Sequence, residues 1–76
     1  MPTIKRLNGC RIEMYFADHG MPHFHVVDAR NRRASVAIAS LEVLAGQVDA
    51  RALREACDWA GQNRGLLLRT WKQFSE

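Results

Sequence analysis

The sequence predicts an α+β domain in which an antiparallel meander of four to five strands is covered on one face by a long C-terminal helix. In residues 3–44, apolar and polar residues alternate over short runs that turn residues separate, a pattern typical of half-buried strands. In residues 49–74, apolar residues recur at helical spacing. The apolar strand faces need a cover, and this helix is the element available. The 76 residues fit one domain, spanning 1–76.

The first two strands are expected to form a hairpin. Asn8-Gly9 is a strong turn signal because both residues tolerate positive φ. The run Arg11–Phe16 alternates, with Ile12, Met14 and Phe16 on one face and Arg11, Glu13 and Tyr15 on the other.

The remaining strands follow two further breaks. Gly20 and Pro22 interrupt the chain, and alternation resumes at His23, with Phe24 and Val26 on one face and His23, His25 and Val27 on the other. After a polar, basic turn over 28–33, we expect a strand at 34–38 and a shorter one at 41–44. Arg11, Glu13, Tyr15, His23 and His25 then share the face that the helix leaves uncovered, and a one-residue register shift would reverse this.

The C-terminal region reads as helix from Asp49, a favourable N-cap. Its apolar stripe packs on the sheet. Gly61 and Gly65 each weaken a helix by roughly 1 kcal/mol relative to alanine. We therefore expect one long helix with a kink between these glycines; two helices with a break near Asn63–Gly65 are the alternative.

Composition excludes several classes of protein. The chain is 47% hydrophobic and 25% charged, which is globular rather than disordered composition. No run approaches eighteen apolar residues, so we expect no membrane span, and the N-terminus does not resemble a signal peptide. The two cysteines form no CxxC pair, which favours reduced thiols and a cytoplasmic location. A domain of this size is marginally stable alone, so a homodimer or another partner is expected.

All three histidines fall within one stretch, residues 18–27, as His-x3-His-x-His. His23 and His25 lie on one side of a strand, about 7 Å apart along the chain. With His19 as third ligand and Asp18 as fourth ligand or acceptor, they would suit a divalent transition metal such as zinc. The spacing matches no strong zinc motif, and no cofactor is firmly implied.

The same histidines support two other hypotheses. His23 and His25, with Tyr15 beside them, could perform metal-independent cleavage of a phosphodiester as general base and general acid, because imidazole titrates near neutral pH. Alternatively, the histidines contact backbone carbonyls or a partner and carry no chemistry. The sequence leaves these alternatives open.

Two further sets of residues are candidates for contact with nucleic acid or protein. The net charge of +3 is small, but Arg30, Arg32 and Arg33 cluster in one turn and could hold an RNA backbone, although a solvated hairpin tip is the simpler interpretation. Trp59 and Leu66 lie off the main helical stripe, where they either widen the buried face or form a patch for a partner.

The sequence resembles a known family, the domain of unknown function DUF4160. The resemblance covers nearly the whole chain. It rests on the opening Met-Pro-Thr-Ile, the phrase from Tyr15 to Val26, the run 41–46, the pair Asp58-Trp59, and Leu67-Leu68 with Trp71. The resemblance implies a small prokaryotic protein without established activity or catalytic residues. It also implies association with a small DUF2442-like partner, often encoded alongside, in pairs proposed to be toxin–antitoxin modules.

This chain departs from the family pattern at two positions. Met21 stands where the family usually has a second proline, which implies a less rigid turn. Asn63 stands where many members have a helical histidine. If that histidine is a ligand or catalytic group in the family, this chain lacks it.

Overall fold

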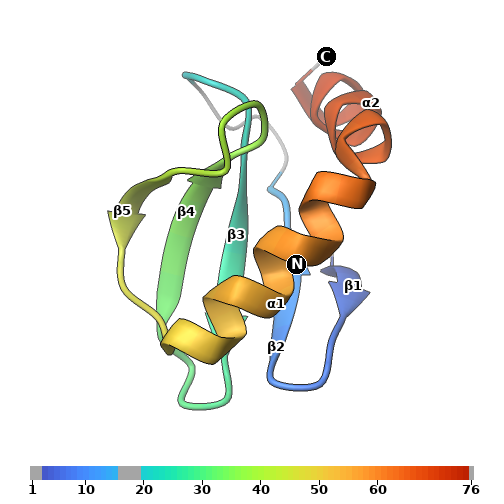
Figure 1. Ribbon diagram of the computed structural model, residues 1–76. Coiled ribbons are helices and arrows are strands. Elements are labelled where there is room, and N and C mark those ends of the chain that lie inside the picture. The colour runs from blue at the N-terminus through green and yellow to red at the C-terminus, as the bar shows by residue number, and fades with distance from the viewer. Residues whose placement is uncertain (1–2, 16–19, 76) are drawn as a thin grey trace.

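The computed structural model, which describes residues 3–15 and 20–75, has one antiparallel sheet and a second layer of helix (Figure 1). The five strands lie in chain order, β1-β2-β3-β4-β5, so the sheet is a meander. The elements are β1 Thr3–Arg6, β2 Cys10–Glu13, β3 His23–Asp28, β4 Arg33–Ala37, β5 Val43–Gly46, α1 Ala50–Gln62 and α2 Arg64–Ser75. The α+β class and the antiparallel meander are confirmed.

The first hairpin forms around Asn8-Gly9 as predicted. β1 and β2 pair antiparallel, and the N–H of Leu7 donates to the carbonyl of Cys10 at 2.8 Å across the turn. β2 is shorter than the alternating run, because its pairing ends at Glu13. The prediction for Phe16 falls outside the described residues.

The core lies between the sheet and α1, where the alternation placed it. The inward-facing side chains of β2, β3 and β4, and of the residues directly after β2 and β4, are 0% exposed: Ile12, Met14, Phe24, Val26, Val36 and Ile38. Ala52, Ala56 and Ala60 are the buried residues of α1, and their small side chains let this helix lie close to the sheet that it crosses in Figure 1. Leu67 of α2 extends the same cluster. The predicted inward faces of these strands are therefore confirmed, whereas the last strand lies at Val43–Gly46 and not at 41–44 as expected.

The C-terminal helical region is two helices, so the expectation of one long, kinked helix was wrong and the alternative break near Asn63 is correct. Asn63 leaves helical geometry, with φ −132° and ψ 27°. Its side-chain amide donates to the carbonyl of Trp59 at 2.8 Å, and its backbone N–H donates to the carbonyl of Ala60 at 3.0 Å. Asn63 thus satisfies carbonyls at the end of α1 that a continuing helix would have used.

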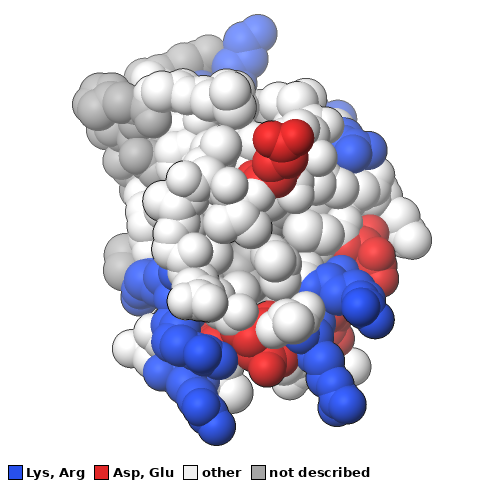
Figure 2. All heavy atoms as spheres, turned by 60° about the vertical axis from the view of Figure 1, so that its left-hand side comes forward, with Lys and Arg blue, Asp and Glu red and all other residues white. Residues whose placement is uncertain are grey.

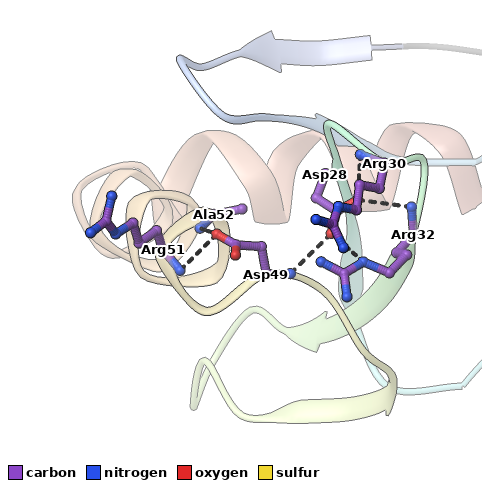
Figure 3. A network of polar contacts seen from close by, with 6 residues as sticks. All are labelled: Asp28, Arg30, Arg32, Asp49, Arg51 and Ala52. Atoms are coloured by element: carbon purple, nitrogen blue, oxygen red, sulfur yellow. Dashed lines mark hydrogen bonds and ion pairs between the residues drawn. The ribbon is translucent and has the colours of Figure 1, made fainter.

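The carboxylate of Asp28 joins the β3–β4 turn to the start of α1 (Figure 3). It accepts backbone N–H groups of Arg30 at 3.0 Å and Arg32 at 2.9 Å, and the Nε of Arg32 at 2.8 Å. It also accepts the backbone N–H of Asp49 at 2.9 Å, and Asp49 caps α1 by accepting from Arg51 and Ala52. One buried carboxylate therefore fixes both the turn and the first residue of the helical layer.

A second carboxylate ties α1 to the first hairpin. Glu55 accepts the backbone N–H groups of Gly9 at 3.0 Å and Asn8 at 3.3 Å. The two hairpin tips and the N-terminal half of α1 are thereby held at one end of the molecule. Among the described residues, no helix is long and apolar enough to cross a membrane.

Only glycine fits at the last position of β5. Gly46 has φ +82°, and a Cβ there would lie 2.3 Å from the carbonyl oxygen of Arg33. Gly20 has φ +88° but open space around it. We expect Gly20→Ala to lower the free energy of unfolding by roughly 1 kcal/mol through backbone strain, and Gly46→Ala to lower it by about 3 kcal/mol or more. Urea unfolding measures both, and equal losses would contradict the steric account.

Candidate functional site

The face of the sheet opposite the helices carries four of the predicted site residues, Tyr15, His23, His25 and Arg33. Strand pairing sets Glu13 directly opposite His25, and His25 directly opposite Ser35. Side chains paired in this way lie on the same face. We call Glu13, Tyr15, His23, His25 and Arg33 the open-face cluster.

Glu13 is the centre of the open-face cluster. Its carboxylate accepts Arg11 Nε at 2.6 Å, Tyr15 Oη at 2.9 Å and Arg33 Nη1 at 2.9 Å. Arg33 Nη1 also donates to Tyr15 Oη. The Glu13 side chain is only 4% exposed. Because a buried carboxylate is costly without donors, these contacts hold the phenol and two guanidinium groups in fixed positions.

The contacts change the protonation chemistry of the cluster. Burial alone would raise the pKa of Glu13, but hydrogen bonds from Arg11, Tyr15 and Arg33 outweigh it and lower the pKa to about 2. Burial, followed by the hydrogen bond to Glu13 and its charge, raises the pKa of Tyr15. Glu13 is therefore an anion and Tyr15 a neutral donor across the physiological range.

Two imidazoles and two larger aromatic rings form a continuous row beside Glu13. The ring centroids of His23 and His25 are 5.0 Å apart, with the planes at 76°. The Tyr15 ring lies 4.3 Å from His25, and the Trp71 ring of α2 lies 4.9 Å from His23. The strand thus brings the imidazoles together as predicted.

Each histidine also has a polar contact. His23 Nδ1 lies 2.8 Å from the carbonyl oxygen of Met21, which orients this ring from the turn before β3. His25 Nδ1 lies 3.4 Å from Ser35 Oγ on the neighbouring strand. Both rings are half-buried, so their positions are set by the fold while part of each surface stays accessible.

Polar side chains cover the apolar centre of the sheet face that has no helix over it. Val27 is 1% exposed although it lies on that side of β3, where Arg11 pairs opposite it. Long polar side chains therefore cover the apolar centre of this face, as their aliphatic stems allow.

The structure divides the predicted arginine cluster. Arg33 begins β4 and contacts Glu13 on the open face, whereas Arg32 pairs with Asp28 at the hairpin end. The side chain of Arg30 is exposed at the same end as Arg32. Arg33 therefore belongs to the open face, whereas Arg30 and Arg32 lie at the hairpin end.

The other predicted site residues lie apart from the open-face cluster. Trp59 is partly buried and packs against the core, and Leu66 is 40% exposed on α2. Asp18 and His19 lie outside the described residues, so only His23 and His25 of the predicted four-residue metal set can be placed. Within the described part of the chain, no group of three or more histidine, cysteine, aspartate or glutamate side chains is placed to hold a metal ion.

Sequence reasoning did not identify Glu13 and Trp71 as residues of the site. Glu13 was predicted to share the open face, but a glutamate in an alternating strand gives no sign that three donors converge on it. Trp71 follows the core stripe of the helix, yet its ring also reaches His23. One signal could have pointed to the role of Glu13. Arg33 is a charged residue at the start of an apolar strand, and such a residue needs a partner such as this carboxylate.

A surface pocket of about 680 Å³ lies away from the histidines, between the hairpin tips and α1. Its lining includes the acids Asp28, Asp49 and Glu55, all of which accept backbone N–H groups. Arg30, Arg32 and Arg51 line it as well. Equal numbers of acids and arginines leave no strong field for a charged ligand, so we place the candidate site on the open face.

The comparisons with known proteins give one match. The model of a family described as a domain of unknown function (DUF4160) matches residues 9–72. The match includes the whole open-face cluster. No curated protein and no solved structure match this chain.

The lowered pKa of Glu13 predicts how the free energy of unfolding changes with pH. A carboxylate whose pKa is about 2 when folded, against an ordinary 4.5, stabilises the fold fully above pH 4.5 and loses that contribution as the pH falls toward 2. We expect Glu13→Gln to be less stable at neutral pH and to lose less free energy of unfolding over this interval. Urea unfolding at several pH values measures the difference.

The matched control is Glu42→Gln, which removes an exposed carboxylate on the β4–β5 loop. This variant should lose the same free energy of unfolding as the parent when the pH falls. Part of that loss comes from Asp28, because burial raises the pKa of its carboxylate but the hydrogen bonds that it accepts lower the pKa further. If Glu13→Gln and the parent lose stability in parallel, the Glu13 network does not have the assigned role.

Proposed function

The chain belongs to the DUF4160 family, and we propose that it is a partner-binding module that presents the open-face cluster to a second small protein. The observation that carries this proposal is the order of the cluster before any partner binds. Glu13 fixes Tyr15 and Arg33, and the aromatic row fixes both imidazoles. A surface that is already ordered loses little side-chain entropy on binding.

The composition of the cluster fits a protein interface. Tyrosine, tryptophan and arginine are the residues that most often dominate the binding energy of interfaces. Tyr15 contacts His25 and Trp71 contacts His23, and Arg33 donates to Tyr15. Arg11 and Arg33 carry two positive charges against the one carboxylate of Glu13. The preferred partner surface therefore combines acidic side chains with flat apolar groups.

The biological setting follows from the family resemblance. We propose that the partner is a small DUF2442-like protein encoded beside this chain, and that the two form a toxin–antitoxin-like pair in the cytoplasm. Covering the open-face cluster would then be the means by which one protein controls the other.

The test is co-expression with the protein encoded beside this gene, followed by co-purification and calorimetry. Arg33→Ala should weaken the complex roughly tenfold or more, because it removes a central guanidinium. Arg54→Ala removes the same charge from an exposed position on α1 and should leave affinity unchanged.

A second variant separates binding from folding. Ser35→Arg adds bulk opposite His25 without removing any contact of Glu13, and it should also block the complex. Circular dichroism confirms that each variant is folded. Failure of the parent to bind the neighbouring protein, or equal binding by Ser35→Arg, would refute this function.

A second candidate function is metal-independent cleavage of RNA on the same face. The 5.0 Å separation of the His23 and His25 rings favours it, with Tyr15 beside His25 and Arg33 hydrogen-bonded to Tyr15. One neutral imidazole would take the proton of a ribose 2′-hydroxyl, whose oxygen attacks phosphorus. The bond from phosphorus to the 5′-oxygen would break, and the other imidazolium would protonate that leaving oxygen.

This candidate predicts RNA cleavage by the purified chain in the presence of a metal chelator. His23→Ala and His25→Ala should each lower the rate by about 10²- to 10⁴-fold. The double variant should be little slower than either single variant, because the two groups act as one unit. Growth of cells expressing each variant gives a parallel readout. Absence of cleavage by the parent, or unchanged rates in both variants, would eliminate the enzyme hypothesis.

A further inference from the structure

The open-face cluster alone is too small for a stable interface with another protein. Specific interfaces bury roughly 800 Å² on each partner and involve about 20–30 residues a side. In the cluster, Glu13 is buried and Tyr15, His23 and His25 are half-buried, so these side chains expose little area. A protein that binds there has to cover a neighbouring surface as well.

The row of rings leads from the sheet onto α2. The Trp71 ring lies 4.9 Å from the His23 ring, so α2 borders the cluster directly. The side of the molecule that carries β5 presents both signs of charge, because Figure 2 shows acidic groups between lysine and arginine at its lower end. By contrast, α2 carries Arg64, Arg69 and Lys72 and no acidic residue. The α2 side therefore offers a single sign of charge to a partner.

Helical spacing places Leu68 on the flank of α2 that continues the open face. With 3.6 residues per turn, each residue is turned about 100° from the one before. Starting from the buried Leu67, Trp71 is turned about 40° toward the open face, where its ring meets His23. Leu68 is turned about 100° in the same direction, and Leu66 about 100° in the opposite one. Leu68 is 45% exposed, so its side chain extends the apolar surface of Trp71.

Two basic residues lie on either side of Leu68 along the same flank. Arg64 and Lys72 are four residues before and after it, which is the spacing of neighbours on one side of a helix. Both are exposed. Arg64 donates to two backbone carbonyls, which orient its guanidinium without neutralising its charge. We call Arg64, Leu68 and Lys72 the α2 stripe, in which an apolar side chain lies between two positive charges.

We propose that the partner of the open face also binds α2, through an acidic amphipathic helix that lies along the α2 stripe. An apolar side chain of that helix packs on Leu68 and Trp71. Two helices side by side have the same rise per residue, so acidic side chains four residues before and after the apolar one come opposite the two cations. Recognition through apolar anchors at helical spacing is a recurrent mode of binding, and complementary charges fix its register. This inference rests on the proposed function and adds the chemistry of the partner.

The test is calorimetry of the full chain with the protein encoded beside this gene. Leu68→Glu places a negative charge against the acidic helix and should weaken binding roughly tenfold or more. Leu66→Glu makes the same change at a leucine that is 40% exposed on the opposite flank, and it should leave the affinity unchanged. Circular dichroism confirms that both variants are folded.

A second pair of variants tests the charges of the α2 stripe. Lys72→Gln and Gln73→Glu change the net charge equally at adjacent exposed positions, but only Lys72 belongs to the stripe. Lys72→Gln should weaken binding about threefold and make the affinity less sensitive to salt, because salt screens ion pairs at a surface. Gln73→Glu should leave both quantities close to those of the parent.

The outcomes distinguish this inference from the proposed function. Failure of the parent to bind the neighbouring protein would overturn both. Binding that Arg33→Ala weakens, with Leu68→Glu equal to the parent, would overturn the α2 contact alone and leave the open-face function in place.

Other occupants of the α2 stripe give different results. Weaker binding by Leu66→Glu but not by Leu68→Glu would place the partner on the other flank and overturn the proposal. Self-association of the chain, or binding to vesicles of anionic phospholipid, that Leu68→Glu abolishes while the complex stays intact would also overturn it.

Discussion

The fold depends on a single buried carboxylate that connects the sheet to its cover. Asp28 is 4% exposed and accepts from the turn that joins β3 to β4 and from the backbone N–H of Asp49. Because Asp49 is the N-cap of α1, the position of the helix is set at the same point as the hairpin. One helical layer docked in this way covers one face of the sheet and leaves the other face to the open-face cluster.

The uncovered face is stabilised by polar contacts instead of a second helical layer. Glu13 draws two guanidinium groups and a phenol over the apolar centre of the sheet, where Val27 is buried beneath them. The same contacts fix the row of rings that includes His23 and His25. The stabilising network and the proposed recognition surface therefore share the same residues, and a change to Glu13 would alter both.

The sequence alone determined the features that depend on neighbouring residues. Alternation placed the faces of β2 and β3, Asn8-Gly9 placed the first hairpin, and Asp49 placed the start of the helices. The tertiary structure decided which distant groups meet. The contacts of Glu13 with Arg33 and of Asp28 with Asp49 join residues that no local pattern relates. The sequence left open whether the helix continues past Asn63, and the structure shows that it ends there, where the side-chain amide of Asn63 donates to the carbonyl of Trp59.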